Sequence, residues 1–167
     1  MKDSNNTRPS KGWILAFHPD LICGTALGAN IRDYTFFSYR PEEALHISLR
    51  EKQVILELLD KINQELQRCI DCYSQKIISK YIELLLDYCE RFYERQFITR
   101  NEANKQIIGR FNRLLDHHFH TIQSQSADLP TIEDCAGSLH LSPAYFNDLL
   151  EYETGKSFKE YLQFKRF

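Results

Sequence analysis

The chain contains little glycine and proline and has no excess of charge of one sign. Its 167 residues include six glycines and five prolines, too few for a collagen-like, linker-like or low-complexity sequence. The 21 basic and 23 acidic residues leave a formal net charge of −2. Because nucleic-acid binding draws on positive charge, this balance gives no global electrostatic argument for it, and it includes no acidic tail.

Long apolar runs are also missing. The longest, such as Leu84–Leu86, are far shorter than a membrane span, and the polar N-terminus Met1–Lys11 lacks the apolar region of a secretory signal. The five cysteines form an odd and scattered set, at positions 23, 69, 72, 89 and 135. Such a set is typical of reduced thiols rather than of a disulfide framework. The sequence therefore predicts a cytoplasmic protein without a membrane partner.

The apolar content is nevertheless sufficient for a core. Hydrophobic residues make up 43% of the chain and aromatic residues 13%, with 11 Phe and 9 Tyr, so wholesale disorder is not expected. The length fits one ordinary domain or two small ones.

Two short aromatic runs in region 1–47 have the pattern of buried strands. Gly12–Phe17 (GWILAF) is ended by Pro19, and Tyr34–Tyr39 (YTFFSY) is bounded by Pro41. Two strands alone do not make a stable sheet. We therefore expect that the rest of a sheet is missing from this region.

Region 48–120 has helical periodicity throughout. A capping box of Ser48 and Glu51 opens a first helix, and a second is predicted from about Asp71 toward Phe97. Thr99 and Glu102 form another such box at the start of a third helix, which continues to about Phe119. The three apolar stripes are compatible with simple core packing, with a bundle or with a dimerisation surface.

The segment 121–130 is polar and aperiodic, which is typical of a linker. Three more helix starts follow it in region 131–167. They are Thr131 with Asp134, Ser142 with Pro143, and Ser157 with Glu160. Gly155 stands where the second of these helices should end. The third is still periodic at Phe167, so we expect the chain to end in mid-helix.

A short helix, a tight turn and a second helix over residues 131–157 are what a helix-turn-helix requires. Phe146, Leu149 and Leu150 would bury one face of the second helix. The opposite face is left for solvent or a DNA groove and carries Ala144, Asn147, Asp148 and Glu151. In a major groove, an Asn side chain can bond adenine through two hydrogen bonds and an Asp can accept one from cytosine.

The segment Ala136–Leu162 closely resembles the first helix-turn-helix of AraC-type transcription regulators. The resemblance rests on the SPAYF start, the ETGKSF exit and the KEYL helix that follows. Upstream, the stretches GWILAFHPDLICGT, FFSY and ERFYERQFITR are similar, more weakly, to the sensor-domain end and helical connector of family members with a cupin-like sensor.

The resemblance implies a mainly α chain with four parts. Region 1–47 would be remnant β-strands of a cupin-like sensor domain, 48–120 a helical connector and dimerisation region, 121–130 a linker, and 131–167 a three-helix AraC-type unit. The second helix-turn-helix of the family would be absent. The chain is thus expected to be a truncated, sequence-specific DNA-binding transcription regulator.

The resemblance also implies partners and site residues. The partners would be the major groove of double-stranded DNA, a second copy bound through 48–120, and a small-molecule effector in the missing sensor barrel. The DNA-binding positions would be Ser142, Ala144, Tyr145, Asn147, Asp148, Glu151 and Lys156.

The local charge departs from that of a DNA-binding unit. Asp148 and Glu151 occupy positions where the family often has basic residues, and residues 128–167 hold four basic and seven acidic side chains, a net of −3. Because phosphate neutralisation dominates affinity for DNA, weak autonomous binding is expected. The alternative is a helical oligomerisation or interaction module without autonomous DNA binding.

Metal and enzyme functions are not expected. Cys69 and Cys72 form half of a zinc or redox motif, but no second ligand pair follows at suitable spacing. His117, His118 and His120 lie at the predicted end of a helix, where imidazoles favour the dipole. No nucleophile elbow or phosphate-binding glycine loop is present, so we expect no cofactor, no metal and no catalytic residues.

Overall fold

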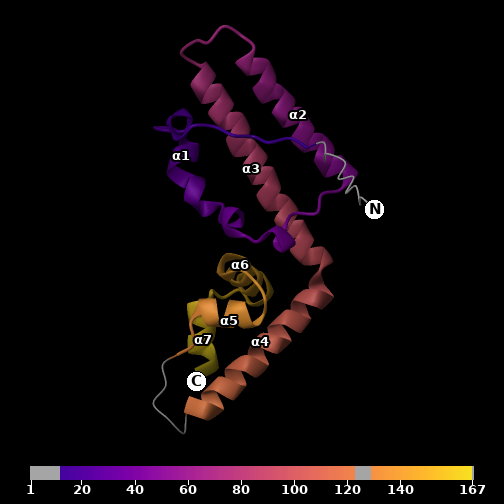
Figure 1. Ribbon diagram of the computed structural model, residues 1–167, viewed down its shortest axis with the longest axis vertical. Coiled ribbons are helices and arrows are strands. Elements are labelled where there is room, and N and C mark those ends of the chain that lie inside the picture. Colours follow the sequence, from indigo (N-terminus) through magenta and orange to yellow (C-terminus); the bar gives the residue numbers. More distant parts are fainter. Residues whose placement is uncertain (1–11, 123–128, 167) are drawn as a thin grey trace, which may run out of the picture.

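The computed structural model describes residues 12–122 and 129–166, and over these ranges it is built from helices with no strand. The prediction of a mainly helical chain is confirmed. The molecule is elongated, with α1, α2 and α3 at one end and α4, α5, α6 and α7 at the other (Figure 1).

A helical hairpin forms the first half. Helix α2 (Leu49–Leu66) starts at Ser48, whose hydroxyl accepts a hydrogen bond from the Glu51 amide while the Glu51 carboxylate accepts one from the Ser48 amide. This confirms the predicted capping box. Helix α3 (Ser74–Thr99) returns beside α2, and the short α1 (Ala26–Asn30) packs on α3. Their shared core includes Leu27, Leu58, Ile62, Ile78 and Ile82.

Helix α4 (Asn101–Ile122) continues from α3 after a break at Arg100 and carries the second half of the molecule. The predicted capping box of Thr99 and Glu102 is not formed, because Thr99 still belongs to α3 and its hydroxyl donates to the carbonyl of Gln96. Helix α4 also extends two residues into the predicted linker 121–130. Residues 123–128 of that linker, like Met1–Lys11, lie outside the described residues.

Three short helices pack on α4: α5 (Ile132–Ser138), α6 (Pro143–Thr154) and α7 (Phe158–Arg166). Their core is continuous with Phe111 and Leu115 of α4 and includes Ala136, Phe146, Leu150, Phe158 and Leu162. A third, smaller cluster of Phe97, Tyr145 and Leu149 joins the end of α3 to α6.

The two strands predicted in region 1–47 are not formed. Residues 12–18 have no regular structure and Trp13 is 72% exposed, while Thr35–Ser38 is a 3₁₀ turn, labelled η3. With no neighbouring strand in the described ranges, the backbone of Tyr34–Tyr39 is satisfied by local bonds instead, such as the Tyr39 amide to the carbonyl of Phe36. Another 3₁₀ turn, η4 (Pro41–Glu43), follows and leads toward α2.

Candidate nucleic-acid interface

A four-residue turn, Leu139–Ser142, joins α5 to α6. The amide of Leu141 donates to the carbonyl of Ala136 at 2.9 Å, and His140 takes a left-handed conformation with φ of 60°. Ala136 is fully buried between the helices, where a larger side chain would force them apart. The angle between α5 and α6 is therefore fixed by the small side chain of Ala136 in α5 and by the left-handed backbone of His140 in the turn.

Both ends of α6 are capped as the sequence predicts. Ser142 is the N-cap, and its hydroxyl accepts a hydrogen bond from the Tyr145 amide at 3.2 Å, with Pro143 in the first turn. Gly155 ends the helix with φ of 67°, a left-handed conformation that favours glycine. The amide of Phe158, the first residue of α7, then donates to the side-chain oxygen of Asn147 at 3.2 Å.

The predicted buried face of α6 is confirmed. Phe146, Leu149 and Leu150 are fully buried. The ring of Phe146 meets that of Phe111 on α4 edge-on, with 4.9 Å between centroids. This contact seats α6 on α4.

The rest of α6 is less open than the sequence predicts, because the segment 34–43 lies against it (Figure 1). Tyr145 is only 3% exposed, and its ring contacts those of Tyr39 and Phe97 at centroid distances of 5.1 and 5.4 Å. Asp148 accepts a hydrogen bond of 2.6 Å from the hydroxyl of Tyr39. Two of the predicted DNA-binding positions, Tyr145 and Asp148, are thus engaged by the N-terminal region.

Ser142 is also covered. It is 3% exposed, and the carboxylate of Glu43 accepts from its amide at 2.6 Å and from its hydroxyl at 2.5 Å. Of the remaining predicted positions, Ala144 and Asn147 are half-buried and Glu151 is exposed. Lys156, beyond the end of α6, places its ammonium group 5.4 Å from the ring centroid of Phe164.

Burial and charge change the acidity of two tyrosines at this contact. Burial raises the pKa of Tyr39, and the neighbouring Asp148 carboxylate raises it further. Burial also raises the pKa of Tyr145, while the guanidinium of Arg100 partly opposes this change. Both hydroxyls are therefore neutral at physiological pH.

The residues that cover α6 were not among the predicted site residues. Tyr39 is separated in sequence from its partner Asp148 by 109 residues, and Glu43 is separated from Ser142 by 99. Phe97 is separated from Tyr145 by 48 residues. Local sequence patterns carry no signal for a pairing at such separations. The only local feature was the Pro41-Glu42-Glu43 run, which is typical of a turn or helix start.

A cavity of about 370 Å³ lies where this segment, α3 and α6 meet. Its wall combines aromatic rings with carboxylates: Phe36, Tyr39, Tyr93, Phe97, Tyr152, Asp33, Glu90, Glu94, Asp148 and Glu151. Burial raises the pKa of Glu90, and the charges of Asp87 and Glu94 raise it further. The surroundings of the exposed end of α6 are therefore strongly acidic.

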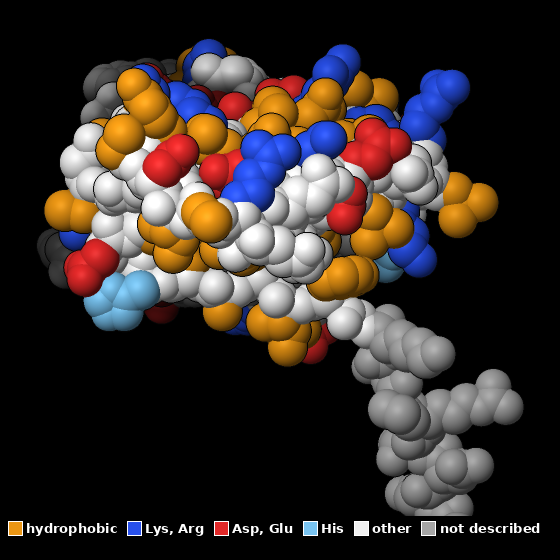
Figure 2. All heavy atoms as spheres, turned by 90° about the horizontal axis from the view of Figure 1, so that it is seen from above, with side chains coloured by type: hydrophobic (Ala, Val, Ile, Leu, Met, Phe, Trp, Pro, Cys, Tyr) orange, Lys and Arg blue, Asp and Glu red, His pale blue; other side chains and the backbone are white. Residues whose placement is uncertain are grey.

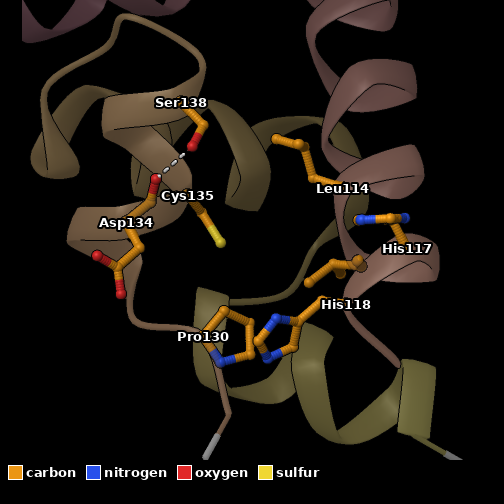
Figure 3. A pocket seen from close by; sticks show the side chains of 8 residues that line it. Leu114, His117, His118, Pro130, Asp134, Cys135 and Ser138 are labelled. Carbon is orange, nitrogen blue, oxygen red and sulfur yellow. Dashed lines mark hydrogen bonds between the residues drawn. The ribbon is translucent and has the colours of Figure 1, made fainter. Parts of the chain in front are cut away.

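A second cavity, of about 320 Å³, lies between the end of α4 and α5 (Figure 3). Cys135 points its sulfur into it, and His117, His118 and Asp134 line it. Burial, with a smaller contribution from Asp134, raises the pKa of Cys135 to about 11, so its thiol is protonated at neutral pH and is a poor nucleophile. Throughout the described ranges, no three His, Cys, Asp or Glu side chains are placed to hold a metal ion.

Cys69 and Cys72 are both exposed, and neither is bonded in a disulfide.

The end of the molecule seen in Figure 2 shows Lys and Arg side chains interleaved with Asp and Glu and with hydrophobic groups, so this face has no continuous basic surface. In the part of the chain that the structure covers, none of the helices has the length and apolar character needed to cross a bilayer.

Comparison with known protein families, with curated proteins and with solved structures finds no match to this chain.

Proposed function

We propose that the chain is a sequence-specific DNA-binding transcription regulator of the AraC type, with α6 as its recognition helix. The observation that supports this most is the joint of α5 and α6. A buried Ala136, a four-residue turn and a Ser142 cap occur on the same residues that resemble the AraC-type motif. A helix presented in this way can enter a major groove with its N-terminal residues toward the bases.

Asn147 is the residue best suited to read a base. Its side-chain oxygen accepts from the Phe158 amide, and its NH₂ group is still available to an acceptor on adenine. Ala144 and Glu151 lie on the same side of α6 and would contact thymine methyl groups or cytosine amines. Asp148 would accept a hydrogen bond from cytosine, and Ser142, Tyr145 and Lys156 would position the helix or contact the backbone.

The proposed partners follow from the same reading. A second copy would bind through region 48–120, where Tyr73, just before α3, and Ile77 and Leu84 of α3 are exposed around a hollow of about 480 Å³. Two recognition helices would then be offered to successive major grooves. A small-molecule effector is proposed as a further partner, and the protein would act in the cytoplasm.

The test is selection from random-sequence duplex DNA at low salt, followed by anisotropy measurements on the selected duplex. Asn147→Asp keeps an acceptor oxygen for the Phe158 amide but removes the NH₂ donor, so we expect the sequence preference to be lost while the fold is kept. Asn63→Asp, on the exposed side of α2, makes the same change of charge away from α6. This variant should bind all duplexes slightly and equally less tightly than the wild type, and its sequence preference should be unchanged.

One observation favours a second candidate, a helical interaction module without autonomous DNA binding. Ser142, Tyr145 and Asp148 are already engaged within the chain, and the surroundings of α6 are acidic. This candidate predicts no sequence preference at any salt concentration for the wild type or for Asn63→Asp.

A further inference from the structure

We propose that the cavity where the segment 33–39, α3 and α6 meet is a binding site for a small organic cation of the linear polyamine class. The cavity has a volume of about 370 Å³, which lies within the usual range of small-molecule sites, about 300–1,000 Å³. Its walls combine aromatic rings with carboxylates. The site is independent of the DNA-binding function proposed above, because the cation needs neither a DNA groove nor a second copy of the chain.

Five aromatic rings from three parts of the chain form the apolar part of the walls. Tyr93 of α3 stacks on Phe36, with 5.5 Å between the ring centroids, and meets Tyr39 edge-on at 5.1 Å. Further along α3, Phe97 stacks on Tyr152 of α6, again at 5.5 Å. Aromatic rings attract ammonium groups, and they also pack against the methylene groups of a cationic chain. The rings therefore suit an aliphatic chain that carries positive charge.

The same walls carry five carboxylates: Asp33, Glu90, Glu94, Asp148 and Glu151. Among the described residues, no Lys, Arg or His side chain lines the cavity, and none of the ion pairs involves any of these five groups. The Tyr39 hydroxyl donates to Asp148, but it carries no charge. The described part of the chain therefore leaves the negative charge of this cavity uncompensated.

The carboxylates around the cavity disfavour one another's ionised form. Burial raises the pKa of Glu90, and the charges of Asp87, Glu94, Asp148 and Asp33 raise it further. A cation bound among these groups would offset their repulsion. Binding should therefore stabilise the folded chain as well as fill the cavity.

The spacing of the carboxylates favours a cation with several separated charges over a metal ion. A metal ion needs several ligands that converge on one point, and no three His, Cys, Asp or Glu side chains of the described residues are placed to hold one. The carboxylates come from three parts of the chain instead: one just before η3, two in α3 and two in α6. A linear polyamine carries protonated amines separated by methylene groups, so it can meet several of these carboxylates while its chain lies on the rings.

The first test is isothermal titration calorimetry of the full chain with spermidine at low salt. We expect saturable binding to a single class of sites. Octanediol, an uncharged aliphatic chain of similar length, should not bind, because it offers the carboxylates no positive charge. Absence of spermidine binding, or equal binding of spermidine and octanediol, would overturn the proposal.

Two double variants show whether the cation binds in this cavity. Glu94→Gln combined with Glu151→Gln removes two carboxylates from its walls, both of them exposed, and should bind spermidine about tenfold less tightly than the wild type. Glu57→Gln combined with Glu102→Gln makes the same change of net charge at two exposed residues outside the cavity. This control should lose no more than about twofold. Equal losses in the two double variants would show diffuse attraction and refute the site.

Tyr152 tests the rings separately from the charges. Its side chain is 43% exposed, so its replacement should leave the fold intact. Tyr152→Leu removes the ring and should weaken spermidine binding about fivefold, whereas Tyr152→Phe keeps the ring and should bind like the wild type. If the two variants bind spermidine equally, the aromatic wall takes no part in binding and the proposal fails.

Thermal unfolding gives a readout that does not depend on the heat of binding. Saturating spermidine should raise the melting temperature of the wild type and of the control with Glu57 and Glu102 replaced, and should raise that of the variant without Glu94 and Glu151 much less. Magnesium at the same ionic strength should not reproduce the rise, because a single small ion cannot meet carboxylates spread around the wall. A rise that magnesium reproduces, or that all the proteins share equally, would be general screening and would contradict the site.

Discussion

The hydroxyl group of Tyr39 donates a hydrogen bond of 2.6 Å to the carboxylate of Asp148, which lies 109 residues further along the chain. The bond joins the region expected to be a sensor remnant to the helix expected to read DNA. Around it, Tyr39 also meets the rings of Tyr93 and Tyr145 edge-on. These contacts make the N-terminal segment and α6 parts of one packed unit rather than separate modules.

Replacing Tyr39 with Phe tests this joint. The change keeps the ring contacts and removes only the hydrogen bond to Asp148, so we expect the free energy of unfolding to fall by about 1–2 kcal/mol. Tyr34→Phe is the matched control, because the hydroxyl of Tyr34 donates a bond of the same length to Asp87 on α3. Urea unfolding should give similar losses for the two variants.

Amide hydrogen exchange separates the two variants. Tyr39→Phe should speed exchange in the first turn of α6, whereas Tyr34→Phe should leave that turn unchanged. If both variants, or neither, speed exchange there, the Tyr39–Asp148 bond does not hold the segment on α6.

Several helix boundaries could be predicted from the sequence because they depend on neighbouring residues, although the predicted box of Thr99 and Glu102 was wrong. Ser48 with Glu51, Thr131 with Asp134, and Ser142 with Pro143 each act within one turn. Gly155 ends α6 for a similarly local reason, its left-handed backbone. The mainly helical character of the chain follows from these signals together with the apolar periodicity.

The partners of α6 could not be predicted in the same way. The aromatic run Tyr34–Tyr39 has the composition of a strand, and only the absence of a neighbouring strand in the described structure turns it into a 3₁₀ segment that packs on α3 and α6. Tyr145 and Ser142 are predicted DNA-binding positions, and both are buried. Their burial depends on Glu43, Phe97 and Tyr39, and therefore on the path of the whole chain.

Glu51 provides a prediction about pH. Partial burial raises its pKa, but the amide and hydroxyl of Ser48 and the guanidinium of Arg95 outweigh this effect and lower it overall. Glu51→Gln should therefore lower the free energy of unfolding by about 1 kcal/mol at neutral pH. The loss is modest because solvent screens the charge of the half-exposed Arg95.

The sign of the pH dependence follows from the lowered pKa. The stabilisation by Glu51 is complete above its unfolded pKa of about 4.3 and is lost as the pH falls through the lower folded value. Urea unfolding from pH 7 to pH 2 should show that the wild type and Glu51→Gln differ in free energy of unfolding. This difference should disappear only at the acidic end of the range. Glu102→Gln, which removes an exposed carboxylate 3.9 Å from Lys105, should change stability little at any of these pH values.

Two glycines should respond to alanine in opposite directions. A Cβ atom at Gly28 would lie 2.1 Å from the carbonyl oxygen of Ile22, so the backbone must move and we expect Gly28→Ala to destabilise the fold by about 2–3 kcal/mol. Gly109 lies within α4 with nothing within 4 Å of such an atom. Gly109→Ala should stabilise by about 0.5–1 kcal/mol, because alanine is the better helix former. Thermal or urea unfolding in which Gly28→Ala is as stable as the wild type would contradict the close approach at Gly28.

The proposed dimer surface on α3 leads to a test of association. Tyr73, Ile77 and Leu84 follow the helical repeat and remain exposed, so a second copy could bury them together. We expect the wild type to associate as its concentration rises in sedimentation velocity, and Leu84→Glu to remain monomeric because a carboxylate there would be desolvated.

Leu49→Glu controls for the added charge in that experiment. Leu49 is the first residue of α2 and is 88% exposed, and an acidic residue in a first helical turn is favourable. This variant should fold normally and associate like the wild type. A wild type that sediments as a single monomeric species at every concentration would refute the proposed dimer, and equal association of all three proteins would move the interface away from Leu84.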